Sequence, residues 1–202
     1  MKVDNEKLIE LISEKQIKNK VEEIAASISK IYDGQAPILI GILNGSFIFC
    51  ADLVRALDID CEIDFIKVTS YKGTQSKGTV RLRKDISAVI TDRHVIIVED
   101  IIDSGLTIKF IRDRMREAGP KSVAIVTLLL KPDIAKLDFD IDWVGFEISP
   151  EFVVGYGLDY DQKLRNLRGV YRLEGIENLS LIHISEPTSR YAISYAVFCL
   201  KK

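Results

Sequence analysis

Four runs rich in apolar residues, separated by segments with helical periodicity, constrain the fold of this chain most strongly. The runs are APILIGIL (36–43), CEIDFIKV (61–68), HVIIVEDI (94–101) and SVAIVTLLL (122–130). Helices are predicted at about 14–32, 45–58 and 106–119. Apolar strands that alternate with helices are typical of a parallel sheet covered on both faces. We therefore predict an α/β fold with a mostly parallel, twisted sheet and helices on both faces.

The boundaries of two helices carry specific signals. Ser13 and Gln16 form a capping-box pattern in front of the first helix, and Gly119 with Pro120 closes the third. Between the second and third strands, TSYKGTQSKGTV (69–80) has no hydrophobic periodicity, and it is interpreted as either a long hairpin or a mobile loop.

Acidic residues stand at the end of the third run and just after it. Glu99 and Asp100 stand at the end of the predicted strand, and Asp103 comes three residues later. Ligands of parallel sheets bind outside the carboxyl ends of the strands. Adjacent carboxylates repel one another, and their burial requires cations or hydroxyl donors. A sugar diol or a hydrated Mg²⁺ ion supplies such partners.

The stretch DSGLT (103–107) continues the same turn into the third helix. It offers two hydroxyl groups, a conformationally free glycine and the unpaired N–H groups of a helix N-terminus, which together suit a phosphate monoester. The competing interpretation is that Asp103 or Ser104 only caps the helix. Three acids in one turn favour the binding site, because a cap needs one.

Composition excludes several classes of protein. The net charge of −2 over 202 residues disfavours nucleic acid as a partner, and no apolar run is long enough to span a membrane. The three cysteines (Cys50, Cys61 and Cys199) are widely spaced, so we expect reduced thiols and a cytoplasmic location. Neither histidine forms a pattern with Ser or Cys that would indicate hydrolase chemistry.

The segment VIIVEDIIDSGLTI (95–108) resembles the phosphoribosyl-pyrophosphate signature of the type I phosphoribosyltransferases. LNGSFIFCADLVR (43–55), SYKGTQSKG (70–78), LLLKP (128–132) and FVVGYGLDYDQKLRNL (152–167), in that order, extend the resemblance to the bacterial hypoxanthine-guanine branch. The resemblance covers roughly residues 10–175. It implies purine salvage with Mg²⁺ as cofactor, phosphoribosyl pyrophosphate and 6-oxopurines as ligands, a small hood formed by the terminal segments, and a homodimer or homotetramer.

The resemblance also implies roles for individual residues. Glu99 and Asp100 would hold the ribose hydroxyls and a metal ion, and Asp103 would be the acid/base near purine N7. The 5′-phosphate would be bound by Ser104, Gly105, Leu106 and Thr107. Pyrophosphate would be bound by Arg165 with Leu43, Asn44 and Gly45. The purine would be bound by Lys131 at its 6-oxo group, by Phe152 through stacking, by the Val153 backbone and near Asp159, which would help to hold a second Mg²⁺. Ser70 and Tyr71 would lie on a lid (69–79).

Several of these residues have ordinary alternatives. Lys131 follows a strand and precedes Pro132, where a solvated loop lysine is common, and Phe152 fits a buried strand. Asp159 could only favour a turn, and Arg165 could lie on the surface. Two positions depart from the family pattern, because many relatives carry lysine at the position of Asn44 and some carry lysine at that of Leu106.

Two wider alternatives remain. A related enzyme acting on orotate, uracil or adenine would share the acidic signature, and a non-catalytic regulator could use the same fold to sense phosphoribosyl pyrophosphate. The predicted domain spans residues 1–178. Residues 179–202 break the pattern, and we expect them to be a non-native or disordered tail.

Overall fold

The computed structural model describes residues 2–3, 6–71 and 79–173. The helices are α1 (Glu14–Ile31), α2 (Phe47–Ala56) and α3 (Leu106–Glu117). The strands are β1 (Lys2–Val3), β2 (Glu6–Ile12), β3 (Ile38–Leu43), β4 (Glu62–Tyr71), β5 (Thr79–Lys84), β6 (His94–Ile102), β7 (Ser122–Leu130), β8 (Trp143–Glu147), β9 (Val153–Val154) and β10 (Val170–Leu173). The predicted tail and most of the predicted lid lie outside the described residues.

The predicted parallel sheet is confirmed. Its six strands have the order β5-β4-β3-β6-β7-β8, and every neighbouring pair is parallel except β4 with β5. From β3 the chain passes to β4 on one side and later to β6 on the other. The strand order therefore reverses between β3 and β6, and a crevice for ligands is expected outside their carboxyl ends.

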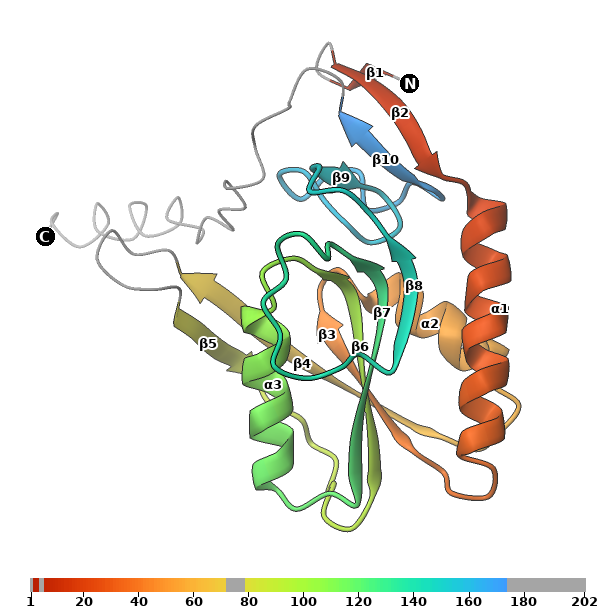
Figure 1. Ribbon diagram of the computed structural model, residues 1–202, viewed down its shortest axis with the longest axis vertical. Coiled ribbons are helices and arrows are strands. Elements are labelled where there is room, and N and C mark those ends of the chain that lie inside the picture. Colours follow the sequence, from red (N-terminus) through yellow and green to blue (C-terminus); the bar gives the residue numbers. More distant parts are fainter. Residues whose placement is uncertain (1, 4–5, 72–78, 174–202) are drawn as a thin grey trace, which may run out of the picture.

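The two faces of this sheet bury separate apolar clusters. One cluster joins α1 and α2 to alternate residues of the strands, such as Leu39, Ile96 and Val98. The other joins α3 to the intervening residues, such as Ile40 and Ile97. Figure 1 shows α1 and α3 on opposite sides of the sheet. The alternation follows from the two-residue period of a strand, and the central strands β3, β6 and β7 are buried on both faces.

Helix α1 begins where the capping box predicts. The Ser13 side chain accepts from the Gln16 backbone N–H at 3.4 Å, and the Gln16 side chain accepts from the Ser13 N–H at 3.0 Å. The buried positions of the helix recur at intervals of three and four residues. They are Ile17, Val21, Ile24, Ala25 and Ile28.

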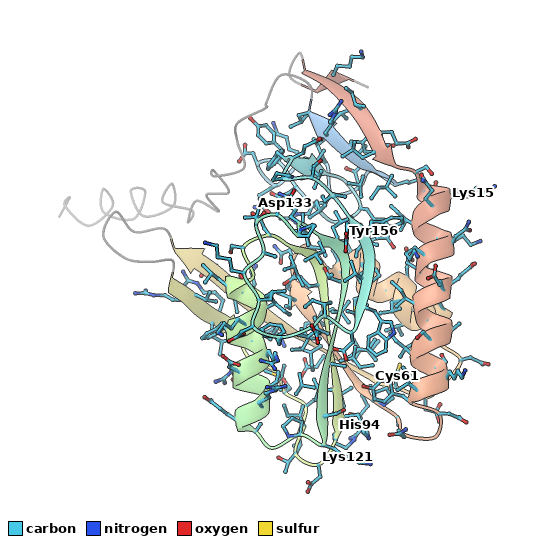
Figure 2. All side chains as sticks on the ribbon, viewed as in Figure 1. Lys15, Cys61, His94, Lys121, Asp133 and Tyr156 are labelled. Atoms are coloured by element: carbon cyan, nitrogen blue, oxygen red, sulfur yellow. The ribbon has the colours of Figure 1, made fainter. Side chains whose placement is uncertain are left out.

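A second, four-stranded sheet forms the predicted hood. Its order is β1-β2-β10-β9, all antiparallel, so it joins the first described residues to the last. The hood lies at the top of Figure 1, beyond one end of the large sheet. In Figure 2, Asp133 and Tyr156 lie at that end, and His94 and Lys121 lie at the opposite end. Because β6 begins at His94, the hood covers the carboxyl ends of the strands.

No helix within the described ranges is both long and apolar enough to cross a membrane.

Candidate active site

The two acids near the end of β6 are buried side by side. Glu99 is 5% exposed and Asp100 is 9% exposed. Burial, together with the negative charge of Asp100, raises the pKa of Glu99 well above the ordinary value for a carboxyl group. The pair lies at the point where the strand order reverses. It therefore favours a ligand that brings hydroxyl donors or a cation.

The turn after β3 lies directly against this acid pair. The carboxylate of Asp100 occupies the space where a side chain at Gly45 would begin, and a Cβ there would lie 2.5 Å from the Asp100 Cγ atom. Gly157 packs against the Gly45 carbonyl in the same way. The Leu43–Asn44 peptide bond in this turn is cis. Residues 43–45, 99–100 and 157 therefore meet although they are distant in sequence.

The turn between β6 and α3 leaves the start of the helix without a side-chain cap. Gly105 is the N-cap residue, with φ of +83°, and it has no side chain with which to cap. Ser104 Oγ accepts only a long bond, 3.5 Å, from the Leu106 N–H. Unlike α1, α3 has no side chain on its N-cap residue, and a helix N-terminus of this kind suits an anion. Gly105, rather than Asp103 or Ser104, stands at the N-cap position, and Ser104 supplies only this one long bond.

Lys131 and Asp103 form a partly buried ion pair. Lys131 is 5% exposed, and its Nζ lies 3.3 Å from Asp103 Oδ1. The geometry is not that of a hydrogen bond, and Oδ1 is buried without such a bond to any described residue. Lys131 is therefore no solvated loop lysine. The segments that follow β6 and β7 therefore place an acidic and a basic side chain next to each other.

The loop after β9 ties two predicted site residues together. Arg165 pairs with Asp159 Oδ1 at 2.7 Å and donates to the Gly157 carbonyl at 2.7 Å. The second Asp159 oxygen, Oδ2, accepts from the Gln162 N–H at 2.8 Å. Arg165 is thereby held next to the glycine that packs on the 43–45 turn. Both oxygens of Asp159 are engaged within the loop.

The remaining predicted residues lie in the hood or at the edge of the sheet. Val153 is buried in β9 and pairs with Arg172 of β10. Phe152 is partly buried, and its ring meets that of Tyr160 edge-on, with centroids 5.9 Å apart. Ser70 and Tyr71 are the last residues of β4 and pair with β5, whereas their side chains lie outside the description. The long-hairpin interpretation holds for these paired ends.

Two residues of this region were not predicted from the sequence. Lys67 Nζ donates to the Asn44 side-chain oxygen at 3.3 Å. The Tyr156 hydroxyl donates to Asp52 Oδ2 of α2 at 2.7 Å, which fastens the loop after β9 to that helix. Lys67 could have been predicted, because it stands near the end of an apolar run and ligands of parallel sheets bind at the carboxyl ends of the strands. Tyr156 has no comparable signal.

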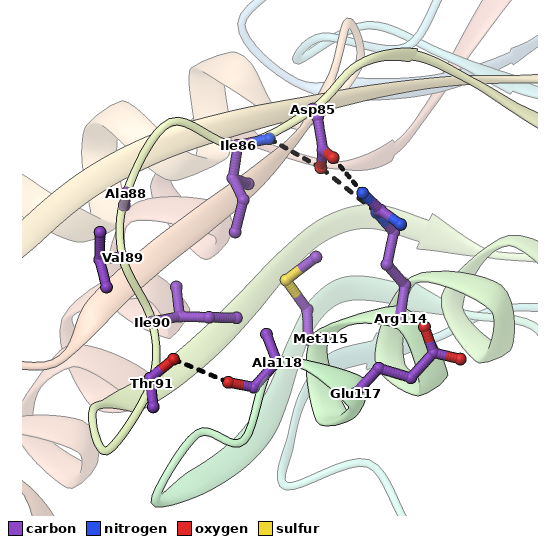
Figure 3. Close-up of a pocket in the computed structure, with 10 residues that line it drawn as sticks. All are labelled: Asp85, Ile86, Ala88, Val89, Ile90, Thr91, Arg114, Met115, Glu117 and Ala118. Atoms are coloured by element: carbon purple, nitrogen blue, oxygen red, sulfur yellow. Dashed lines mark hydrogen bonds and ion pairs between the residues drawn. The ribbon is translucent and has the colours of Figure 1, made fainter.

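A separate hollow lies at the other end of the sheet. Its volume is about 410 Å³, and it lies between the segment 85–91 and the end of α3. Figure 3 shows Arg114 and Asp85 paired across it, and the Thr91 hydroxyl donating to the Ala118 carbonyl at 2.9 Å. None of the predicted site residues lines it. It adjoins the amino end of β6, where ligands of parallel sheets do not ordinarily bind.

Comparison with known proteins identifies similar chains. A family model described as a phosphoribosyl transferase domain matches residues 10–161. The hypoxanthine-guanine phosphoribosyltransferase of Bacillus subtilis (strain 168) is 46% identical over 168 residues, which are 83% of this chain and 92% of the relative. The hypoxanthine phosphoribosyltransferase of Haemophilus influenzae is 44% identical over 161 residues, 78% of this chain and 90% of the relative.

Solved structures give the same result. A hypoxanthine-guanine phosphoribosyltransferase from Bacillus anthracis matches with a TM-score of 0.77 and 44% identity, covering 82% of this chain and 96% of that one. A hypoxanthine phosphoribosyltransferase from Trypanosoma cruzi, in complex with the product IMP, matches with a TM-score of 0.78 and 36% identity. That match covers 87% of this chain and 98% of the other.

Proposed function

The chain belongs to the hypoxanthine-guanine phosphoribosyltransferase family, and we propose that it transfers the 5-phosphoribosyl group of phosphoribosyl pyrophosphate to hypoxanthine or guanine. The products are IMP or GMP and pyrophosphate, so the reaction serves purine salvage. One observation carries the proposal. A buried acid pair and a helix start with glycine at its N-cap position lie in one continuous turn, at the point where the strand order reverses.

The sugar and its phosphate would be bound by consecutive residues. Glu99 and Asp100 would accept hydrogen bonds from the ribose hydroxyls, which relieves the burial of two unpaired carboxyl groups. The backbone N–H groups of residues 104–107 would bind the 5′-phosphate at the start of α3. Their fixed spacing along the chain would hold C1′ in one position.

The base would be recognised by the pair at the ends of β6 and β7. The Lys131 ammonium group can donate to a 6-oxo oxygen, whereas the exocyclic amine of adenine is itself a donor. As Lys131 turns to the purine, Asp103 would be freed to accept or return the N7 proton. Phe152 would stack on the ring, and the Val153 backbone would meet its edge.

The leaving group would be bound on the other side of the sugar. Loss of pyrophosphate runs ahead of attack by the purine, so positive charge grows on the ribose ring while C1′ inverts. The acid pair would stabilise that charge, and Arg165 with the Leu43–Gly45 turn would stabilise the departing anion. A lid over residues 69–79 would keep water from the activated sugar.

We propose Mg²⁺ as the cofactor. Glu99 and Asp100 fit it, because Mg²⁺ takes oxygen ligands and is commonly held by one or two carboxylates together with substrate phosphates. When bound, the ion would neutralise charge on the pyrophosphate. Asp159 would be able to contribute only by giving up a bond to Arg165 or Gln162.

Initial rates with hypoxanthine, guanine, xanthine, adenine, orotate and uracil, with and without Mg²⁺, test this function. We expect 6-oxopurines to react in the presence of Mg²⁺ and adenine to react at least ~10²-fold more slowly, because it would leave buried polar groups unpaired. Equal rates with adenine or a pyrimidine would refute the assignment. Binding of phosphoribosyl pyrophosphate without any product would instead support a non-catalytic regulator.

The homodimer or homotetramer and the cytoplasmic location remain predictions. Light scattering on the purified chain tests the first, and fractionation of the source cells tests the second.

A further inference from the structure

Lys67 reaches the 43–45 turn, on the proposed pyrophosphate side of the site, from the neighbouring strand β4. It is paired in register with Leu43, the last residue of β3, so it stands level with the start of the 43–45 turn. Its Nζ donates to the Asn44 side-chain oxygen at 3.3 Å. Asn44 is neutral, so this bond orients the ammonium group without neutralising it.

The adjacent lysine on β5, Lys84, has an acidic partner within the protein. Lys84 is the register partner of Lys67 and pairs with Asp64 at 3.2 Å, and it also donates to two backbone carbonyls. Lys67 makes no ion pair with any acidic side chain in the described part of the chain. Of these two neighbouring lysines, Lys67 is therefore the one whose charge stays available to a bound anion.

The surroundings of Lys67 favour an anion. Helix α2 begins three residues after Asn44, and its positive end faces this turn. Ser46 makes no side-chain cap, because its hydroxyl donates to the Ile42 carbonyl instead. An ammonium group has three donors, and Asn44 takes one. Two donors therefore remain for phosphate oxygens.

We propose that Lys67 is a pyrophosphate-binding residue that supplies the positive charge which the turn itself lacks at Asn44. Asn44 then acts as a positioning residue that holds the Lys67 ammonium group at the turn. Arg165 reaches the same turn through Gly157, so the two cations would hold the pyrophosphate group from two sides. The inference rests on the proposed function and adds a residue to it.

Calorimetry with Mg²⁺-pyrophosphate and, separately, with IMP tests the role of Lys67. Lys67→Met should weaken pyrophosphate binding by about tenfold, the scale of a lost hydrogen bond to a charged group, whereas IMP binding changes by less than about twofold. Lys67→Arg should keep most of the affinity. Adding Asn44→Lys to Lys67→Met should restore binding, because it returns a cation to the turn.

Lys18→Met is the matched control, because Lys18 lies on the outer face of α1 with its side chain 75% exposed. It should leave both affinities unchanged. The inference is overturned if Lys67→Met binds pyrophosphate as tightly as the wild type, or if it loses IMP binding to the same extent. If the wild-type chain neither binds IMP nor forms it from hypoxanthine, the proposed function itself fails, which is a distinguishable result.

Discussion

Gly45→Ala is the substitution whose effect the structure determines most closely. The added Cβ would overlap a carboxylate oxygen of Asp100 and lie 2.5 Å from its Cγ, whereas carbon atoms in contact are separated by about 3.5 Å. Because the oxygen is the nearest atom, the Asp100 carboxylate would have to rotate away or retreat by well over ~1 Å. No positive φ is involved at Gly45, so the effect would come from this contact alone.

A displacement of that size in a group that holds the sugar should lower kcat/KM for phosphoribosyl pyrophosphate by ~10²-fold. Overpacking should also cost about 1–3 kcal/mol in the free energy of unfolding. Steady-state kinetics and urea unfolding on the same preparation measure both effects.

Gly119→Ala separates the loss of stability from the loss of activity. Gly119 has φ of +69° and open space around it, so alanine there strains the backbone without displacing an acid. This control should lose stability and keep kcat/KM. Wild-type kcat/KM in Gly45→Ala would refute the reasoning, because it would mean that the position of Asp100 does not matter to the reaction.

Three further substitutions test individual roles. Asp103→Asn should lower kcat by ~10²-fold and leave the Kd for IMP nearly unchanged, since only proton transfer is lost; an unchanged kcat would remove the role. Lys131→Gln should reduce the preference for hypoxanthine over adenine, measured as the ratio of kcat/KM values, because an amide can donate or accept; a constant ratio would contradict recognition by Lys131. Glu99→Gln should stabilise the ligand-free protein at neutral pH. The pKa of Glu99 is raised in the folded state, so the folded state binds more protons than the unfolded one between the ordinary and the raised pKa, and wild-type stability falls as the pH rises through that window. Urea unfolding from about pH 5 to pH 8 should show that the free energy of unfolding of Glu99→Gln exceeds that of the wild type by an amount that grows with pH. A difference independent of pH would count against the raised pKa of Glu99 as its cause.

The central elements could be predicted from the sequence because their signals are local. The predicted strand at 122–130 has the same bounds as β7, and the predicted helix at about 14–32 differs from α1 by one residue at its end. Apolar runs and capping residues determine these elements with little help from the rest of the chain. The alternation of apolar strands with helices then predicted the parallel sheet and the helices on its two faces.

The hood strands were not predicted individually from local signals. Strand β2 has the sequence EKLIELI, with charged residues between apolar ones, and its partner β10 lies about 160 residues later in the chain. A strand of four residues such as β10 carries too little periodicity to be recognised, whereas the apolar segment that contains β9 was interpreted as a possible buried strand. Only the family resemblance indicated a hood.

The candidate site also has residues that local sequence signals predict and residues that they do not. The acids and the turn at 99–107 could be predicted from the sequence, because polar residues interrupt an apolar run at a strand end. The ion pair of Arg165 with Asp159 and the approach of Lys67 to Asn44 depend on the packing of distant segments. Side-chain partners of this kind cannot be read from spacing along the chain.

A crystal structure of the chain with IMP would test the central claim most directly. We predict the 5′-phosphate against the backbone N–H groups of residues 104–107 and the ribose hydroxyls against Glu99 and Asp100. A nucleotide bound elsewhere, for example in the hollow between residues 85–91 and the end of α3, would contradict the account.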